Sequence, residues 1–152
     1  WRRVVPSPRP VEIPDLRVLK LLLDQGVIVV CAGGGGIPVM RRADGSLIGV
    51  EAGIDKDAAS ALLAAEVGAD ALLMLTDVDG VYDHWGTPQQ TRIEHMTTAE
   101  ARKRSYPAGS MGPKVEAATA FISNGGKIAG IGKLHDALAI LNAKAGTIVG
   151  RV

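Results

Sequence analysis

The chain has very little cysteine, with a single residue, Cys31, among 152. One thiol cannot form a disulfide within the chain, so a reducing cytoplasm is the predicted compartment. No histidine lies near Cys31 in the sequence, and this favours a small core residue over a nucleophile. There is also no His-Glu-x-x-His motif and no pair of cysteines, so we predict no metal site built by protein side chains.

The sequence also lacks an excess of one charge and lacks a long apolar run. Its 17 basic and 16 acidic side chains nearly cancel, which argues against nucleic acid as a partner because duplex binding needs a clustered basic face. No apolar stretch reaches the length of a bilayer and no charged-then-apolar leader opens the sequence, so no membrane partner is expected. The first residue, Trp1, is not an initiator methionine, and the sequence does not say why the chain starts there.

What the sequence does contain is an alternation of short apolar runs and helical patterns. A length of 152 residues suits one domain with a hydrophobic core. Strands are expected at 27–31, 71–75, 128–131 and 147–149, a hairpin at 39–50, and helices at 15–25, 56–67, 113–123 and 134–142, with a short one after Thr97. Strands that alternate with helices predict an α/β fold with a mainly parallel sheet.

The first fourteen residues are expected to be extended. Four prolines between residues 6 and 14 each bias the preceding residue away from the α region. We therefore interpret residues 1–14 as a linker and residues 15–152 as one α/β domain. Asp15 is the expected cap of the helix that follows, and Gly26 is its expected stop.

Four consecutive glycines, residues 33–36, directly follow the first strand-like run. Without Cβ atoms a backbone can approach a ligand closely, so Gly33, Gly34 and Gly35 are candidates for a nest of N–H groups around an anion. A plain flexible turn is the alternative interpretation. The sequence lacks the Gly-Lys-Ser/Thr of a Walker-type P-loop, and Pro38 stands where the dinucleotide-binding fingerprint needs a helix start.

A lysine stands at the start of each of two expected helices. Lys56, between Asp55 and Asp57, opens the helix before the second strand-like run, and Lys114 opens a later one. A lysine at a helix N-terminus is electrostatically disfavoured unless an anion is present, and the free N–H groups there also favour phosphate. Asp55 is the expected N-cap, and capping is the alternative role for Asp57. The pattern indicates a phosphate near both helix starts.

An acidic turn follows the expected strand at 71–75. It reads Thr76-Asp77-Val78-Asp79-Gly80-Val81-Tyr82. In open α/β sheets ligands bind at the carboxyl ends of strands. Asp77 and Asp79 lie where that rule puts a ligand.

Five segments of the chain resemble, in the same order, the carbamate kinases of the amino-acid kinase superfamily. They are residues 1–8, 33–39, 54–57, 75–82 and 109–117. Each is weak alone, but five in sequence over nearly the whole chain argue against a chance resemblance. The resemblance implies a three-layer α/β sandwich with a mainly parallel sheet. It also implies that an amino-terminal half is missing, so that residues 15–152 correspond to the nucleotide-binding half.

The family resemblance also implies a reaction, the reversible phosphoryl transfer between ATP and carbamate that gives ADP and carbamoyl phosphate. Its physiological direction would be ATP synthesis in arginine or carbamoyl breakdown. By the same resemblance Lys56 neutralises the phosphoryl group in flight, Asp57 organises the lysines, and Lys114 reaches the nucleotide phosphates. Gly33, Gly34 and Gly35 match a turn near the reacting centre. The residues implied to border the nucleotide are Thr76, Asp77, Val78, Tyr82, Met111, Gly112, Pro113 and Lys114.

Further expectations concern cofactors and partners. Family members use Mg²⁺ carried mainly by the nucleotide phosphates, so no protein cage for the metal need appear in the sequence. The resemblance implies a homodimer, and it implies that this chain alone is inactive because the other half supplies the carbamate-side loop and another lysine. Two alternatives stay open. One is a family member that acts on a different acid or a nucleoside monophosphate, and the other is a non-catalytic nucleotide-binding fragment.

Overall fold

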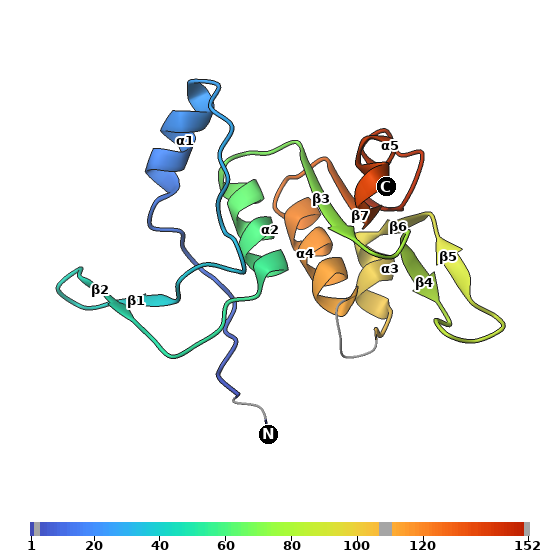
Figure 1. Ribbon diagram of the computed structural model, residues 1–152, viewed down its shortest axis with the longest axis horizontal. Coiled ribbons are helices and arrows are strands. Elements are labelled where there is room, and N and C mark those ends of the chain that lie inside the picture. The colour runs from blue at the N-terminus through green and yellow to red at the C-terminus, as the bar shows by residue number, and fades with distance from the viewer. Residues whose placement is uncertain (2–3, 107–110, 151–152) are drawn as a thin grey trace.

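The computed structural model of the chain describes residues 1, 4–106 and 111–150. Its central sheet has the order β3-β7-β8-β6. These strands are β3 (Ala71–Thr76), β7 (Ile128–Lys133), β8 (Thr147–Gly150) and β6 (His95–Thr97) (Figure 1). β3 pairs with β7 and β6 with β8 in parallel, while β7 and β8 are antiparallel. The prediction of a mainly parallel sheet is confirmed, although the antiparallel pair at its centre was not foreseen.

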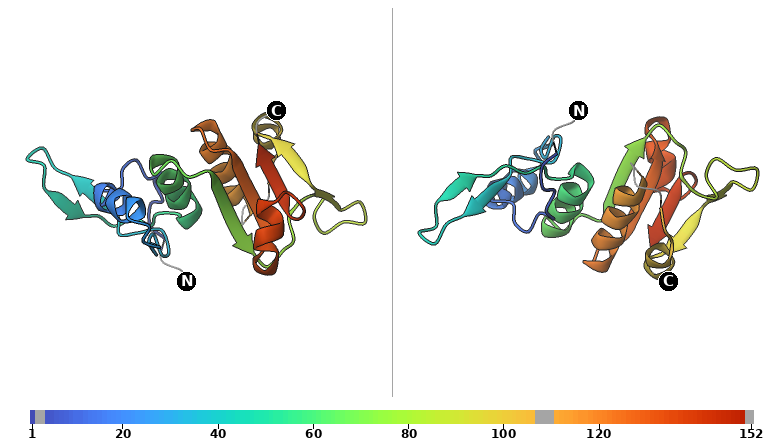
Figure 2. Two further views of the ribbon diagram at one scale, coloured as in Figure 1. Left: turned by 90° about the horizontal axis from the view of Figure 1, so that it is seen from above. Right: turned by 90° about the horizontal axis from the view of Figure 1, so that it is seen from below.

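Helices lie on both faces of this sheet, so the domain has three layers (Figure 2). α4 (Met111–Ser123) packs on one face, and α2 (Lys56–Glu66) and α3 (Thr98–Lys103) pack against α4. The fully buried Phe121 and Ile122 of α4 share one core cluster with Ile131 of β7. The opposite face is covered by α5 (Ala137–Leu141), which follows the 3₁₀ turn η1 (Leu134–Asp136).

Glycines in β7 allow α5 to approach the sheet closely. A Cβ atom on Gly130 would lie 2.3 Å from the Ile140 side chain, and one on Gly132 would lie 2.7 Å from it. Side chains alternate between the two faces of a strand, so Ala129 and Ile131 point to the α4 face. β7 is therefore shaped for different neighbours on its two faces, with no side chain where α5 packs.

The expected N-cap of α2 is confirmed, and α3 begins, as expected, directly after Thr97. Asp55 Oδ1 accepts hydrogen bonds from the backbone N–H groups of Asp57 and Ala58, each at 2.9 Å, and fixes the start of α2. At α3, Thr97 Oγ1 accepts from the N–H of Glu100 while the Glu100 carboxylate accepts from the N–H of Thr97. This reciprocal pair is a capping box, and it holds the pKa of Glu100 below its usual range.

The expected hairpin near the start of the chain is also confirmed. β1 (Val39–Arg41) and β2 (Leu47–Gly49) are antiparallel and turn at Asp44 and Gly45. A second hairpin was missed by the sequence reasoning. Its strands are β4 (Val81–Asp83) and β5 (Thr91–Ile93), and it lies beside the acidic turn.

The expected strand at 27–31 is wrong. These residues have no regular secondary structure, and the side chain of Val30 is 97% exposed. Cys31 is likewise exposed, so its assignment to the core is a second error. The physical reason is that a buried strand needs hydrogen-bonded neighbours and covered faces, and this segment has neither within the described part of the chain.

The whole first third of the chain is sparsely packed. Among the described residues up to Asp55, only Gly35 is buried. α1 (Leu16–Asp24) begins after Asp15 and ends before Gly26, as expected, but the Asp15 side chain makes no capping hydrogen bond. No residue of α1 is buried, although its apolar side chains form a stripe. Residues 4–13 belong to no helix or strand.

No helix in the described ranges is long and apolar enough to cross a membrane.

Candidate functional site

The topology of the chain brings the two helix starts that carry lysines to one end of the sheet, where β3 and β7 have their carboxyl termini. α2 leads into β3, and α4 leads into β7. Because β3 and β7 are parallel, each helix runs back along the sheet and starts near the carboxyl ends of the strands. Lys56 and Lys114, separated by 58 positions, thus lie at the same end of the sheet as Thr76, the last residue of β3.

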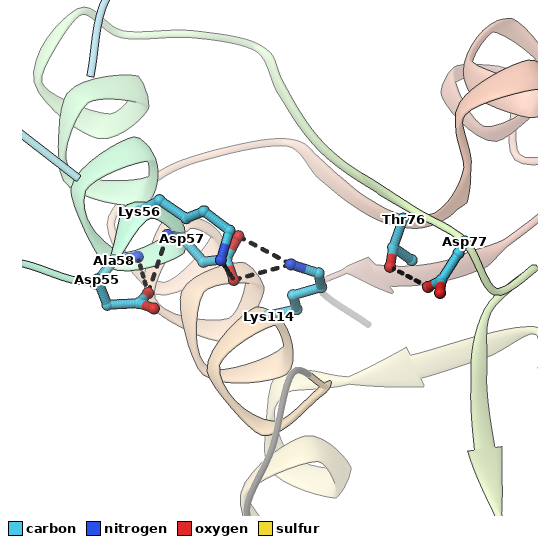
Figure 3. A network of polar contacts seen from close by, with 7 residues as sticks. All are labelled: Asp55, Lys56, Asp57, Ala58, Thr76, Asp77 and Lys114. Carbon is cyan, nitrogen blue, oxygen red and sulfur yellow. Dashed lines mark hydrogen bonds and ion pairs between the residues drawn. The ribbon is translucent and has the colours of Figure 1, made fainter. Parts of the chain in front are cut away.

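The carboxylate of Asp57 joins the two lysines (Figure 3). Lys114 Nζ donates to Asp57 Oδ1 at 3.1 Å and to Oδ2 at 2.9 Å. Lys56 Nζ lies 3.8 Å from Asp57 Oδ2. The Lys114 and Asp57 side chains are only 8% and 9% exposed, whereas that of Lys56 is 58% exposed. Asp57 is therefore a buried bridge, and Lys56 is the charge that faces outward.

The local charge balance favours an anion. Two ammonium groups share one carboxylate, so this cluster carries an excess positive charge. The positive end of the α2 helix dipole lies beside it, although the Asp55 carboxylate caps the N–H groups of Asp57 and Ala58 there. A lysine neutralises phosphate as a point charge, and a partly dry setting strengthens that attraction. The cluster can bind a phosphate or phosphoryl group at the exposed Lys56 side.

The glycine turn is held directly against the start of α2. A Cβ atom on Gly35 would lie 1.8 Å from the carbonyl oxygen of Ile54 and 3.3 Å from the backbone nitrogen of Lys56. The φ angle of Gly35 is +133°, which side chains disfavour for a second reason. Gly33 and Gly34 have open space around them. Only a glycine fits at position 35, and the turn therefore packs directly on the start of α2. The N–H groups of Gly33 and Gly35 donate within the turn, to the carbonyl oxygens of Cys31 and Ala32, each at 2.8 Å. The predicted nest of N–H groups around an anion is thus not formed by these two residues in this conformation.

The acidic turn after β3 forms the other side of the candidate site. Thr76 Oγ1 donates to Asp77 Oδ1 at 3.0 Å. Figure 3 shows these two residues beyond Lys114, at the end of β3. No hydrogen bond or ion pair joins them to Lys114 among the residues that the structure describes. Val78 is half-buried and Asp77 is exposed.

Tyr82 is oriented by a hydrogen bond that the sequence did not reveal. Its hydroxyl donates to Asp79 Oδ1 at 2.7 Å, and Arg92 of β5 lies 3.5 Å from Asp79 Oδ2. This bond lowers the pKa of Asp79 and raises the pKa of Tyr82. The ring of Trp85 meets that of Tyr82 edge-on, with 5.2 Å between centroids. The β4–β5 hairpin thus fixes an aromatic pair beside the acidic turn.

The remaining expected site residues lie in the first turn of α4. Met111 is half-buried and packs on the main core cluster, and Gly112 and Pro113 are half-buried next to it. The preceding loop, residues 107–110, lies outside the described residues. The first turn of α4 therefore carries Lys114 into contact with Asp57 while Met111 anchors the helix on the core.

A separate ion pair braces the hairpin against α3, and sequence reasoning did not find it either. Arg104 donates from Nε to Asp83 Oδ1 at 3.1 Å and from a terminal nitrogen to Oδ2 at 3.2 Å. The pair raises the pKa of Arg104. A pairing across 21 positions has no local sequence signal, because it depends on the route of the chain between α3 and β4.

No group of three or more His, Cys, Asp and Glu side chains is placed to hold a metal ion in the part of the chain that the structure describes. Asp57 is committed to two lysines, which leaves little capacity for a cation.

Comparison with known proteins now supplies a family. Residues 2–131 match the Amino acid kinase family. The carbamate kinase of Rhizobium meliloti (strain 1021) is 51% identical over 151 residues, an overlap that covers 98% of this chain and 47% of that protein. The carbamate kinase of Thermoplasma volcanium is 45% identical over 153 residues, covering 98% of this chain and 50% of that protein.

A solved structure extends this similarity to three dimensions. Carbamate kinase from Giardia lamblia bound to AMP-PNP matches with a TM-score of 0.94 and 42% identity, over 100% of this chain and 49% of that one. The match includes the sparsely packed first third. The chain spans about half the length of the curated relatives it matches.

Proposed function

Since the chain belongs to the amino acid kinase family, we propose that it is the nucleotide-binding half of a carbamate kinase. The proposed reaction is ATP plus carbamate giving ADP and carbamoyl phosphate, used physiologically toward ATP in arginine or carbamoyl breakdown. The observation that carries the proposal is the buried Asp57 carboxylate between Lys56 and Lys114, with the glycine turn packed beside it. A reducing cytoplasm is the proposed compartment, because the chain has one cysteine.

The geometry suits phosphoryl transfer because that reaction asks mainly for positioning and charge neutralisation. Asp57 holds the Lys114 ammonium in place with two hydrogen bonds, the shorter of 2.9 Å. The exposed Lys56 ammonium can contact a phosphoryl group and neutralise the negative charge that develops on that group during transfer. In the glycine turn, Gly34 can offer its backbone N–H to the same group, whereas the N–H groups of Gly33 and Gly35 donate within the turn to Cys31 and Ala32.

Three elements are proposed to border the nucleotide. They are the turn with Thr76, Asp77 and Val78, the hairpin with Tyr82, and the first turn of α4 with Met111, Gly112 and Pro113. Asp79 holds the Tyr82 ring in one orientation, as a ring that packs on a base requires. We propose that Mg²⁺ arrives on the nucleotide phosphates, where it would neutralise part of their charge.

Binding can be tested on the chain as it stands. Isothermal titration calorimetry with Mg-ADP at millimolar concentration should give a saturable heat. Adenosine is the matched ligand control, because it has the base and sugar but no phosphate. A folded sample that gives no heat with Mg-ADP would contradict the proposal.

The role of Lys56 is testable once the other half is supplied. A suitable protein joins this chain to the amino-terminal part of the Rhizobium meliloti relative, which is 51% identical to it. In that protein, Lys56→Ala should lower kcat by about 10²–10³-fold with a smaller change in KM, as expected for a charge that acts in the transition state. A near-normal kcat would show that Lys56 is a surface charge that takes no part in the transition state.

We also propose that the chain alone is catalytically inactive. The relatives are twice as long, and the first third of this chain exposes apolar side chains such as Ile28, Val30 and Ile37. Such a surface calls for a covering layer, and the other half of the fold is the proposed cover. A coupled assay of ATP formation from ADP and carbamoyl phosphate decides this. Turnover of about one per second by the chain alone would contradict the proposal.

A homodimer is the proposed assembly of the complete protein. Two-fold self-association is the commonest way to cover an apolar face, and part of the interface would lie on this half. Sedimentation of the joined protein across micromolar concentrations should show a dimer. A single species of monomer mass at every concentration would exclude it.

A further inference from the structure

A third lysine lies at the same end of the sheet as Lys56 and Lys114. Lys133 is the last residue of β7 and is exposed. Its side chain makes no hydrogen bond or ion pair with any residue in the described ranges. An exposed lysine is by itself only a solvated charge, so its meaning depends on where the strand puts it.

Strand register places Lys133 next to Thr76. The two residues are partners in the parallel pairing of β7 with β3. Gly130 and Gly132 face α5, because a Cβ atom on either would meet Ile140. Alternation along the strand then puts Lys133 on the other face, which α4 covers. Lys133 thus lies at the carboxyl end of β7, on the face of the sheet that α4 covers and at the end where α4 begins.

The surrounding charges agree with this position. The pKa of Asp79 is lowered first by the hydrogen bond from Tyr82, and also by the positive charges of Arg92 and Lys133. Lys133 is therefore within electrostatic reach of the acidic turn. Asp79 already accepts from Tyr82 and pairs with Arg92, so it does not need Lys133 as a partner. The ammonium group of Lys133 is free to meet a ligand at this edge.

We infer that Lys133 is a third phosphate-binding lysine, one that contacts the phosphates of the bound nucleotide from the β7 side of the site. This inference rests on the proposed function. A lysine has donors and no acceptor, and it recognises phosphate as a point charge, so phosphate fits it better than the base does. Lys114 binds from the α4 side, and Lys133 binds from the neighbouring strand.

A matched pair of variants tests the inference. Lys127→Met removes the same charge from an exposed lysine just before β7, at the opposite end of the strand, where it pairs with Asp70 at 2.7 Å. Lys133→Met should weaken Mg-ADP binding by calorimetry about tenfold, as for one charge-assisted contact in a partly exposed site. Lys127→Met should bind like the unsubstituted chain, and Lys133→Arg should recover most of the affinity.

The outcomes separate the two levels of the argument. Equal affinity of Lys133→Met and Lys127→Met for Mg-ADP, with normal binding by the unsubstituted chain, overturns the inference and leaves the proposed function standing. Equal weakening of adenosine and ADP by Lys133→Met also overturns it, because that result means a local structural role. No binding of ADP by the unsubstituted chain overturns both.

Discussion

Residues 4–55 and residues 56–150 of this chain differ sharply in how they are packed. The first region has one buried residue, Gly35, and carries most of the exposed large apolar side chains of the described chain. The second region contains the whole main core cluster. Yet both regions have sequences with apolar runs and helical stripes. An apolar pattern therefore says that a face must be covered, and it does not say by which part of the protein.

Two helices show the difference most clearly. α1 has a strong apolar stripe and no buried residue. α4 has seven buried residues, because the sheet, α2 and α3 surround it. The segment that contains α1 is included in the match to the Giardia lamblia structure, which covers 100% of this chain and 49% of that one. The covering of α1 is thus expected from residues beyond this chain.

The largest expected effect is a cavity in the second region. Phe121 is fully buried, and Phe121→Ala should lower the free energy of unfolding by about 3–5 kcal/mol. Ile28→Ala in the first region should change it by less than about 0.5 kcal/mol, because Ile28 is 93% exposed. Urea unfolding of both variants measures the contrast. Similar losses in the two variants would mean that the first region shares the core.

The next effect concerns the buried ion pair. Lys114→Met leaves Asp57 buried without its main partner and should cost about 2–3 kcal/mol, less than a fully stranded charge because Lys56 stays near. Adding Asp57→Leu should recover much of this stability, since the unpaired charge is then gone. Urea unfolding of the two variants is the measurement. A double variant no more stable than Lys114→Met would show that the pair does not act through its charges.

A smaller effect on global stability is expected at the only buried residue of the first region. Gly35→Ala places a Cβ atom against the Ile54 carbonyl at an unfavourable φ, so the turn must leave α2. Because little else holds residues 4–55, we expect faster limited proteolysis there with about 1 kcal/mol or less lost in urea unfolding. Gly34→Ala is the matched control, since its Cβ atom meets open space. Equal rates of proteolysis in the two variants would contradict the idea that the contact of Gly35 with α2 holds this region in place.

The smallest effect depends on pH. The hydrogen bond between Tyr82 and Asp79 raises the pKa of Tyr82 and lowers that of Asp79. Its stabilisation is therefore full between the unfolded pKa values, about 4 and about 10. It is lost as the pH falls through the lowered pKa of Asp79 or rises through the raised pKa of Tyr82. Tyr82→Phe should cost well under 1 kcal/mol at pH 7, because both groups are partly exposed.

Stability of Tyr82→Phe and the unsubstituted chain, compared from pH 3 to pH 11, measures this difference. The two curves should approach each other toward both ends of the range. A difference that is constant at all pH values would show that the lost hydroxyl acts through packing and not through Asp79.

Local features of the fold were predictable because their causes lie within a few residues. Asp55 and the Thr97–Glu100 box mark helix starts by capping, and the Asp44–Gly45 turn marks the hairpin. β4, β5 and β6 were missed because three-residue strands are too short to show alternation and, unlike β1 and β2, they are not marked by an Asp-Gly turn. The failed strand at 27–31 has the right composition for burial, but burial depends on neighbours that a local pattern cannot supply.

The sequence singled out Lys56, Asp57 and Lys114, and the structure brings these three together, but the contacts between them were only partly predictable. The lysines at helix starts were found from electrostatics, and the glycine turn from its backbone freedom. That Asp57 bonds Lys114 across 57 positions follows from the parallel pairing of β3 with β7, and strand order is not encoded locally. Asp79 as the partner of Tyr82 was equally hidden, although a spacing of three residues in a turn was a signal for it.

The contact of Gly35 with the start of α2 has a thermodynamic consequence. It joins the loosely held region to the firmly held one beside the residues that would bind phosphate. A ligand that touches both the glycine turn and Lys56 binds only to molecules in which the turn is packed on the start of α2. Its apparent dissociation constant is then the intrinsic value divided by the fraction of molecules in which the turn is packed on α2. Any partner that covers α1 and residues 27–31 would raise that fraction, and would tighten nucleotide binding without touching the nucleotide.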